Sequence, residues 1–296
     1  MFRPYPQDDA ALQAALLKLA RLGIEQAEVG ISVNGEVMRR YQVSTAPVIP
    51  AIETTAWETL PSQEIAAIIS RRAKPVTALG EPQESPLETT NDNAVDAGFA
   101  QQIISKPPES ANRCLILVDG DAGSGKSTFA HALAAALPAP ATVVSVDDIT
   151  WYHDLLNWTD AMLSGVIQPW LHGQDVAYRP PGWVAKQRPG AVTVPKDTQY
   201  LIVEGMTAAR PELEKLGALT VFVSSDPAVA TERVVTRDLA LGVNGATRAE
   251  VFGFHAGFQD AVVPFILKNE PWERAAILID GTAATPPGHF ATTEQR

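Results

Sequence analysis

One stretch, residues 114–130 (CLILVDGDAGSGKSTFA), constrains the fold more than any other part of the chain. Five apolar residues typical of a β-strand lead into a glycine-rich turn, and a helical pattern starts at Lys126. The turn, residues 120–127, fits the pattern GxxxxGK[ST] in full. Glycine-rich loops join strands to helices in many folds, but the complete pattern with both flanking elements favours a loop that binds nucleotide phosphates.

The residue types in this loop suit that chemistry. Glycines let successive backbone N–H groups curl around a phosphate, where a Cβ would obstruct them. The N-terminal end of the following helix adds positive potential. We expect Lys126 to reach the β- and γ-phosphates and the Ser127 hydroxyl to bind Mg²⁺. The predicted nucleotide-binding residues are Gly120, Asp121, Ala122, Gly123, Ser124, Gly125, Lys126, Ser127 and Thr128.

Length and composition narrow the class of protein. A chain of 296 residues holds one large or two ordinary domains, and a hydrophobic content of 46% is enough for a packed core. No apolar run is long enough to span a membrane, and the N-terminus lacks a signal-peptide pattern. The net charge of −11 disfavours a nucleic-acid surface. The single cysteine, Cys114, cannot form an internal disulfide, which favours a reducing, cytoplasmic setting.

The chain divides into four parts by composition. Residues 1–75 are predicted to form a small α+β unit, and residues 76–110, rich in proline and polar side chains, have the composition of a linker. Residues 111–282 form the main domain, and we expect the polar tail 283–296 to be disordered. The elements predicted in the first part are a helix ending at Arg21, a hairpin of residues 27–33 and 36–43, and a helix over residues 64–72.

In the main domain, apolar strand patterns alternate with helical patterns. The predicted strands are residues 114–118, 142–146, 200–204, 219–223 and 276–280, and the predicted helices are residues 126–137, 155–171, 227–241 and 248–269. This alternation predicts an α/β fold with a parallel sheet that has helices on both faces. Ligands of such sheets bind at the carboxyl ends of the strands, so the residues there are the candidates for chemistry.

Charged residues follow three of these strands. Asp147 and Asp148 follow the second strand; we expect Asp147 to accept a proton from an attacking hydroxyl or to help hold Mg²⁺, and Asp148 to cap a helix or support the site. Glu204 ends the third strand, where its carboxylate can hold Mg²⁺ or simply face solvent. After the fourth strand, Arg233 and Arg237 share one helix face, where they can clamp phosphate oxygens or form ordinary surface ion pairs.

A long insertion, residues 151–195, separates the second and third strands and is dense in aromatic and polar residues. Because the insertion follows a strand end beside the predicted loop, it is placed to cover a second substrate bound next to the nucleotide. Each of its polar residues can equally be structural. The substrate-contact candidates are His172, Asp175, Tyr178, Arg179 and Trp183, together with Asp147.

The combination of motifs resembles the uridine kinase-like family of P-loop nucleoside kinases, which includes phosphoribulokinase, bacterial-type pantothenate kinase and nicotinamide riboside kinase. The matching segments are VDGDAGSGKST (118–128), VSVDDITWY (144–152), LIVEG (201–205), ERVVTRD (232–238) and PWERAAILIDGT (271–282). The resemblance implies a five-stranded parallel sheet and MgATP as the donor. It implies that Asp147 is the catalytic base, that Glu204 is the Mg²⁺-linked acid, and that Arg233 and Arg237 belong to the lid helix.

The insertion departs from the family pattern. It carries AYRPPGW, with Gly182 where uridine kinases have an aspartate before the aromatic residue. This departure leaves the identity of the acceptor open, and residues 1–110 resemble no family that we recognise.

Two hypotheses for function follow. The first is an ATP-dependent kinase that uses Mg²⁺ and transfers the γ-phosphate to a hydroxyl of a nucleoside or similar small molecule. Lys126, Arg233 and Arg237 would neutralise developing charge, and Ser127 and Glu204 would hold the metal. The second is a nucleotide-binding regulatory protein with a vestigial kinase site. Neither predicts a nucleic-acid or membrane partner, and the oligomeric state, a homo-oligomer included, is left open.

Overall fold

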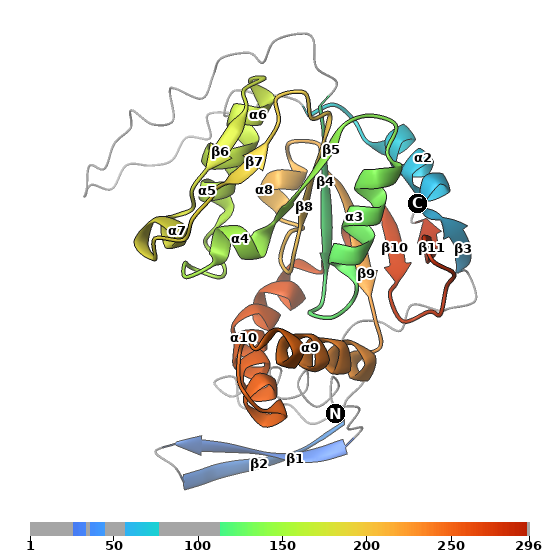
Figure 1. Ribbon diagram of the computed structural model, residues 1–296. Coiled ribbons are helices and arrows are strands. Elements are labelled where there is room, and N and C mark those ends of the chain that lie inside the picture. The colour runs from blue at the N-terminus through green and yellow to red at the C-terminus, as the bar shows by residue number, and fades with distance from the viewer. Residues whose placement is uncertain (1–25, 34–35, 45–56, 77–112, 295–296) are drawn as a thin grey trace, which may run out of the picture.

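The computed structural model describes residues 26–33, 36–44, 57–76 and 113–294 (Figure 1). Its centre is a seven-stranded sheet in the order β3-β11-β10-β9-β4-β8-β5. The strands are β3 (Glu58–Pro61), β4 (Cys114–Gly120), β5 (Ala141–Ser145), β8 (Tyr200–Glu204), β9 (Leu219–Ser224), β10 (Ile277–Asp280) and β11 (His289–Glu294). The strands from β10 to β5 are parallel, and β11 is antiparallel to both of its neighbours. The five predicted parallel strands are confirmed, but the expected five-stranded sheet is wrong because two more strands extend it.

Strand β4 is buried over its whole length because it lies between β9 and β8. Its side chains alternate between the two faces of the sheet. Leu115 and Leu117 pack with the helices of the insertion, whereas Ile116 and Val118 pack with the helices on the other face. This two-sided burial explains why the strand reads as a continuous apolar run.

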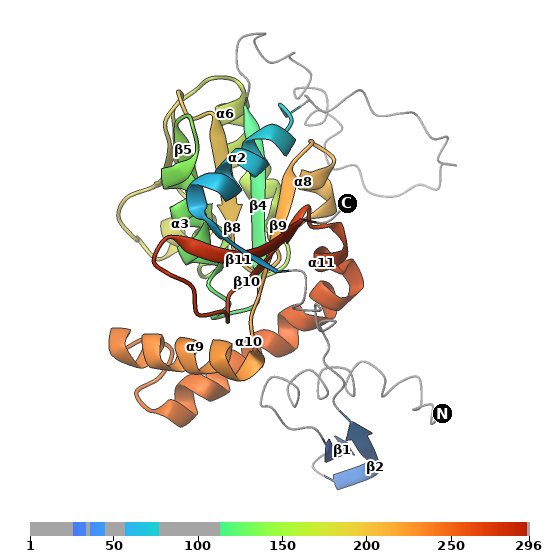
Figure 2. The same ribbon diagram turned by 90° about the vertical axis from the view of Figure 1, so that its right-hand side faces the viewer.

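Helices cover both faces of the sheet (Figures 1 and 2). On one face lie α2 (Ser62–Arg72) and α3 (Lys126–Ala136), which bury Ile65, Ile69, Phe129 and Leu133 in one cluster with the strands. The other face carries the insertion, in which the predicted helix 155–171 begins at Thr159 and runs without a break to Leu171 through a π-helical turn. The further elements on this side are α4 (Val146–Thr150), α5 (Thr159–Met162), the π-helical turn η4 (Leu163–Ile167), α6 (Gln168–Leu171), β6 (Val176–Tyr178), α7 (Pro181–Ala185), β7 (Val192–Val194) and α8 (Pro211–Glu214).

Two helices, α9 (Pro227–Leu241) and α10 (Arg248–Asn269), lie side by side at the end of the sheet where the β4–α3 loop lies (Figures 1 and 2). Both have the predicted bounds, because their ends carry strong signals. The Asp226 side chain accepts hydrogen bonds at the start of α9, Gly242 ends α9 with a positive φ, and Thr247 and Glu250 form a capping box at the start of α10. A short helix, α11 (Pro271–Arg274), leads from α10 into β10.

Two of the expected part boundaries are wrong. Residues 289–294 of the expected disordered tail form β11, in which Ala291 and Thr292 are buried. Residues 58–72, assigned to a separate N-terminal unit, form β3 and α2 of the main sheet and its cover. The short segments were misjudged because β11 is rich in threonine and β3 has only four residues. Their burial comes from partners distant in the sequence.

The predicted hairpin is confirmed as β1 (Gln26–Val33) and β2 (Glu36–Ser44), which pair antiparallel. The predicted helix ending at Arg21 lies outside the described residues, and so does almost all of the predicted linker 76–110. None of the helices in the described part of the chain has the length and apolar character needed to cross a membrane.

Candidate functional site

The β4–α3 loop is packed closely on one side and open on another. Gly120 and Gly123 have positive φ angles of 153° and 78°. A Cβ added to them would lie 2.2 Å from the Val223 carbonyl oxygen and 2.1 Å from the Ala230 carbonyl oxygen, respectively. Gly125, also at positive φ, is the N-cap residue of α3, and a Cβ there would meet nothing within 4 Å. Side chains are therefore excluded where the loop contacts β9 and α9, and the N-terminal corner of α3 is left as an open cradle.

The polar groups of the loop fit a bound phosphate. The Lys126 ammonium donates to the Asp121 carbonyl across the loop, at 3.3 Å, so it is folded back over the cradle. The Ser124 carbonyl accepts a hydrogen bond of 2.9 Å from Ser225. The Ser124 hydroxyl is buried and has no hydrogen-bond partner among the described residues. A buried polar group without a partner is costly, and it is common where a ligand completes the bonding.

Ser127 and Glu204 lie together at the carboxyl end of the sheet. The Ser127 hydroxyl donates to Glu204 Oε2 at 3.0 Å. Glu204 is buried and pairs with Val118 of β4 on one side and with Ser145 of β5 on the other. A hydroxyl and a carboxylate are ligands that Mg²⁺ accepts, and Mg²⁺ commonly uses one or two protein oxygens together with substrate phosphates. These two residues therefore fit a magnesium ion held beside the loop.

Two neighbouring aspartates have different surroundings. Asp147 is exposed at the first turn of α4, and the Ser145 hydroxyl takes the capping position by accepting from the Asp147 N–H at 3.3 Å. Neither aspartate caps α4, so the expectation that Asp148 caps this helix is wrong. Asp148 instead forms an ion pair of 3.0 Å with Arg188. Ser145 of β5 pairs with Glu204, the candidate metal ligand. Asp147 follows Ser145 by two residues, so it lies near the candidate metal site.

A buried carboxylate that the sequence analysis missed lies directly before the loop. Asp119 accepts backbone hydrogen bonds from Gly120 at 2.7 Å, Thr207 at 3.0 Å and Ala209 at 3.0 Å. It thereby joins the start of the loop to the segment that follows Glu204. Burial raises the pKa of Asp119 to about 6, and the three backbone donors together with the charge of Lys126 limit the rise. The signal for it was an acidic residue inside a run that is otherwise apolar.

The two arginines of α9 have different partners. Arg233 donates to the Gly281 carbonyl at 2.7 Å, and Arg237 binds Asp238 through Nε at 2.8 Å. A cavity of about 250 Å³ lies beside the loop; its lining includes Gly125, Thr128, Arg233, Asp280 and Phe290. The turn between β10 and β11 thus forms a wall of this cavity, which could not be predicted while residues 283–296 were read as a disordered tail.

Two of the substrate-contact candidates lie at the wrong end of the sheet. His172 donates from Nδ1 to the Gln168 carbonyl at 2.7 Å, and Asp175 accepts from the Lys196 N–H at 2.9 Å. Gly173, between them, lies close to the guanidinium of Arg113, which precedes β4. The loop follows the opposite end of β4, roughly 20 Å away for a strand of this length. His172 and Asp175 are therefore structural and do not face the site.

The other three candidates have separate contacts on the face of the sheet that carries the insertion. Trp183 is buried and donates from its indole nitrogen to the Asp148 carbonyl at 2.8 Å, and the Arg188 guanidinium lies 3.6 Å from the Trp183 ring centroid. Arg179 donates to the Arg188 carbonyl at 2.8 Å. Tyr178 packs against η4, where a Cβ on Gly165 would lie 2.5 Å from its ring. These contacts make Trp183 and Arg179 part of the wall that supports α4, whereas Tyr178 is a packing residue.

The departure at Gly182 has a steric cause. A Cβ at this position would lie 1.8 Å from the Trp151 carbonyl oxygen, because α7 rests directly on the segment after α4. An aspartate therefore cannot occupy this position without moving α7. The exposed neighbours here are Tyr152 and Lys186, whose ammonium lies 4.6 Å from the Tyr152 ring centroid. Neither Lys186 nor Arg188 was singled out from the sequence, since isolated basic residues carry no distinguishing pattern.

The chain was compared with family models, with curated proteins and with solved structures, and matches were found among the solved structures. No family model matches the chain, and no curated protein matches it. Among solved structures, a "putative fructose transport system kinase" from Silicibacter sp. TM1040 is similar with a TM-score of 0.38 and 25% identity, over 55% of this chain and 87% of that one. A "possible uridine kinase" from Bacillus stearothermophilus gives a TM-score of 0.35 and 14% identity, over 60% of this chain and 93% of that one. At such scores the likeness says nothing about the details of a site, so the chemistry rests on this chain's own residues.

Proposed function

We propose that the chain is an ATP-dependent phosphotransferase that moves the γ-phosphate to a hydroxyl of a nucleoside or a similar small molecule. The observation that carries the proposal is the hydrogen bond between Ser127 and Glu204 beside an open glycine cradle. It brings two metal-binding oxygens next to the phosphate-binding loop. The exposed carboxylate of Asp147 follows the strand beside Glu204.

Each residue has a distinct part in this proposal. The loop and Lys126 hold and orient the nucleotide phosphates, and Arg233 and Arg237 balance negative charge from α9. Ser127 and Glu204 hold Mg²⁺, which neutralises phosphate charge when it is bound. Asp147 accepts the proton of the acceptor hydroxyl, for which its exposed position leaves access. Catalysis is then mainly a matter of positioning and electrostatics.

The cavity beside the loop supports a nucleotide rather than a simple phosphate. Its volume of about 250 Å³ lies just below the range of about 300 to 1,000 Å³ that is usual for small-molecule sites, and Gly125 and Thr128 border both the cavity and the loop. We assign this cavity to the nucleoside part of ATP. The acceptor then approaches from the side of Asp147, where α4 and α7 form the wall.

The acceptor is the least constrained part of the proposal. The side around Asp147 carries Lys186 and Arg188, so a hydroxyl compound that also bears a negative group belongs in the test beside neutral nucleosides. The regulator hypothesis is the second candidate, and the β1–β2 hairpin, which has no part in the proposed reaction, is the observation that favours it.

One assay separates the two hypotheses. ATP consumption is measured with Mg²⁺ against a panel of nucleosides, pantothenate, ribosides and sugar phosphates, with Lys126→Ala as the variant and Lys186→Ala as a control outside the loop. The kinase proposal predicts turnover with at least one acceptor, a loss of at least about 100-fold in Lys126→Ala, and turnover of the same order in Lys186→Ala for a neutral acceptor. A blank panel, with nucleotide-dependent binding to another protein, would select the regulator.

A further inference from the structure

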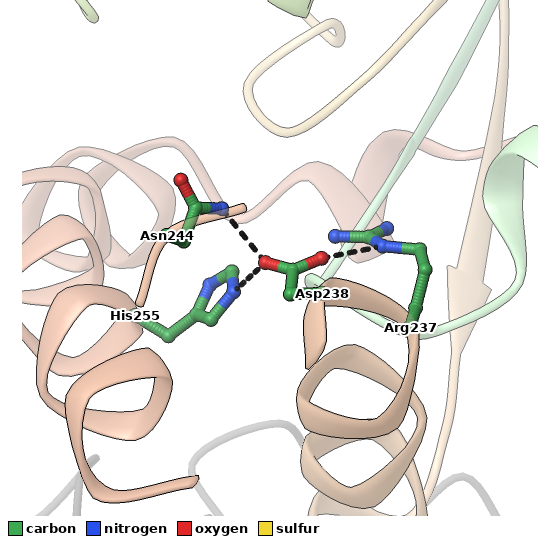
Figure 3. Close-up of polar contacts among 4 residues, drawn as sticks. All are labelled: Arg237, Asp238, Asn244 and His255. Atoms are coloured by element: carbon green, nitrogen blue, oxygen red, sulfur yellow. Dashed lines mark hydrogen bonds and ion pairs between the residues drawn. The ribbon is translucent and has the colours of Figure 1, made fainter. Parts of the chain in front are cut away.

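A further buried carboxylate, Asp238, lies inside the α9–α10 pair (Figure 3). Its Oδ1 atom accepts from Arg237 Nε at 2.8 Å, and its Oδ2 atom accepts from Asn244 Nδ2 and His255 Nε2, both at 2.7 Å. The three partners come from α9, from the turn after α9 and from α10. The side chain of Asp238 is only 1% exposed, so its orientation is set by these partners.

Burying the Asp238 carboxylate costs desolvation free energy, which its hydrogen bonds must offset. Burial raises the pKa of Asp238, but the hydrogen bonds from Asn244, Arg237 and His255 outweigh burial, and the pKa lies below its ordinary value. A buried carboxylate that stays ionised must be fully bonded, and a well-packed apolar residue would often stabilise the helix pair as much. Arg237 meanwhile remains 58% exposed, although its Nε is fixed. The cluster therefore fixes the Nε atom of Arg237, while much of the rest of its side chain is exposed to solvent.

We propose that His255 and Asn244 act through Asp238 as positioning residues for Arg237, holding its guanidinium ready for the terminal phosphate of the nucleotide. One carboxylate oxygen binds Arg237 and the other binds both partners, so the bonds to Oδ2 fix the rotation of the carboxylate and with it the direction of Arg237. An arginine held in place beforehand loses less entropy when it binds phosphate than one that must be ordered. The inference rests on the proposed nucleotide site.

A purely structural role would be a tie between α9 and α10, and the chain offers a matched control for it. Glu232 of α9 and Arg248 of α10 form an exposed ion pair that links the same two helices without contacting Asp238. Arg248→Gln removes that tie and leaves the Asp238 cluster intact. His255→Leu removes the bond to Oδ2, whereas His255→Gln retains an N–H donor that can reach it. Asn244 has a φ of 61°, so Asn244→Gly removes the second donor without straining the turn.

The experiment is calorimetric titration of the full chain with Mg²⁺ and either ADP or the β,γ-imido analogue of ATP. Arg237→Ala is expected to weaken the analogue about tenfold and ADP less than about twofold, because only the analogue carries the third phosphate. His255→Leu should weaken the analogue in the same selective way, His255→Gln should restore it, and Arg248→Gln should match the wild type. The double variant Arg237→Ala/His255→Leu should bind the analogue no more weakly than Arg237→Ala.

The outcomes separate this inference from the proposed function. If the losses in the double variant add, or if His255→Leu weakens ADP and the analogue equally, the positioning role is refuted while nucleotide binding stands. If His255→Leu does not fold, the same cycle with Asn244→Gly decides the matter. If the wild type binds neither ligand, the proposed nucleotide site fails and the inference falls with it.

Discussion

Asp119 makes the stability of the fold depend on pH in a predictable direction. Burial raises its pKa from 3.8 to about 6 in the folded protein. Between these two values the folded chain keeps a proton that the unfolded chain has released, so the contribution of this group to the free energy of unfolding falls as pH rises. The contribution is full below pH 3.8 and is lost as pH passes about 6. A rise of about two pKa units corresponds to a loss of about 3 kcal/mol.

The perturbation that isolates this contribution is Asp119→Asn. The amide does not titrate, and it also loses an acceptor for the Ala209 N–H, which lowers stability by a similar amount at every pH. The free energy of unfolding is measured by urea denaturation between pH 4 and pH 8 for both proteins, with tryptophan fluorescence as the signal. The loss of the Ala209 hydrogen bond is the same at every pH, so it does not affect how the difference in unfolding free energy between the two proteins changes with pH.

We expect the stability of Asp119→Asn relative to the wild type to increase by about 2 kcal/mol from pH 4 to pH 7, because pH 4 already lies above the unfolded pKa of 3.8. Most of the change should fall between pH 4 and about 6, because the folded and unfolded chains differ in bound protons between the unfolded pKa of 3.8 and the folded pKa of about 6. A difference that stays constant within about 0.5 kcal/mol over this range would refute the reasoning, since the carboxylate would then titrate alike in the folded and unfolded chains.

Three further predictions concern single side chains. Gly182→Ala should lower the free energy of unfolding by about 3 kcal/mol or more, because the added Cβ meets the Trp151 carbonyl. The control is Gly253→Ala in α10, where a Cβ meets nothing, and it should leave the free energy of unfolding unchanged or raise it slightly. Urea denaturation compares the two variants. Phe290→Ala should cost about 2 kcal/mol in the same assay, because the ring makes an edge contact with Phe129 at 5.1 Å, and an unchanged midpoint would mean that β11 is not part of the stable sheet. Glu204→Gln should raise the Mg²⁺ concentration needed for half-maximal nucleotide binding by about tenfold or more, and an unaltered Mg²⁺ dependence would remove Glu204 from the metal site.

The elements that could be predicted from the sequence are those whose signals are local. The P-loop pattern, the caps of α9 and α10, and the apolar strands such as β4 carry the information within a few residues. The candidate metal pair could also be predicted, because parallel strands bring their carboxyl ends to one edge and so place Glu204 beside Ser127.

The features that could not be predicted depend on distant partners. β11 is a strand because β10 and β3 lie on either side of it, and its own sequence, HFATTE, is too polar to indicate this. His172 was a reasonable candidate by composition, but the turn after α6 carries it to the amino end of the sheet. Similarly, His255 is a candidate only because it binds Asp238, which lies on another helix. The spacing of the two residues in the sequence does not indicate this contact.

The central claim is phosphate transfer with Asp147 as the proton acceptor, and the neighbouring aspartate provides the most direct test of it. Transfer of labelled γ-phosphate from ATP is measured over the acceptor panel for the wild type, Asp147→Asn and Asp148→Asn. The account predicts transfer by the wild type, a loss of about 100-fold to 10,000-fold in Asp147→Asn with ATP binding retained, and a much smaller loss in Asp148→Asn, whose carboxylate binds Arg188. Transfer by Asp147→Asn at a rate near that of the wild type would contradict the account.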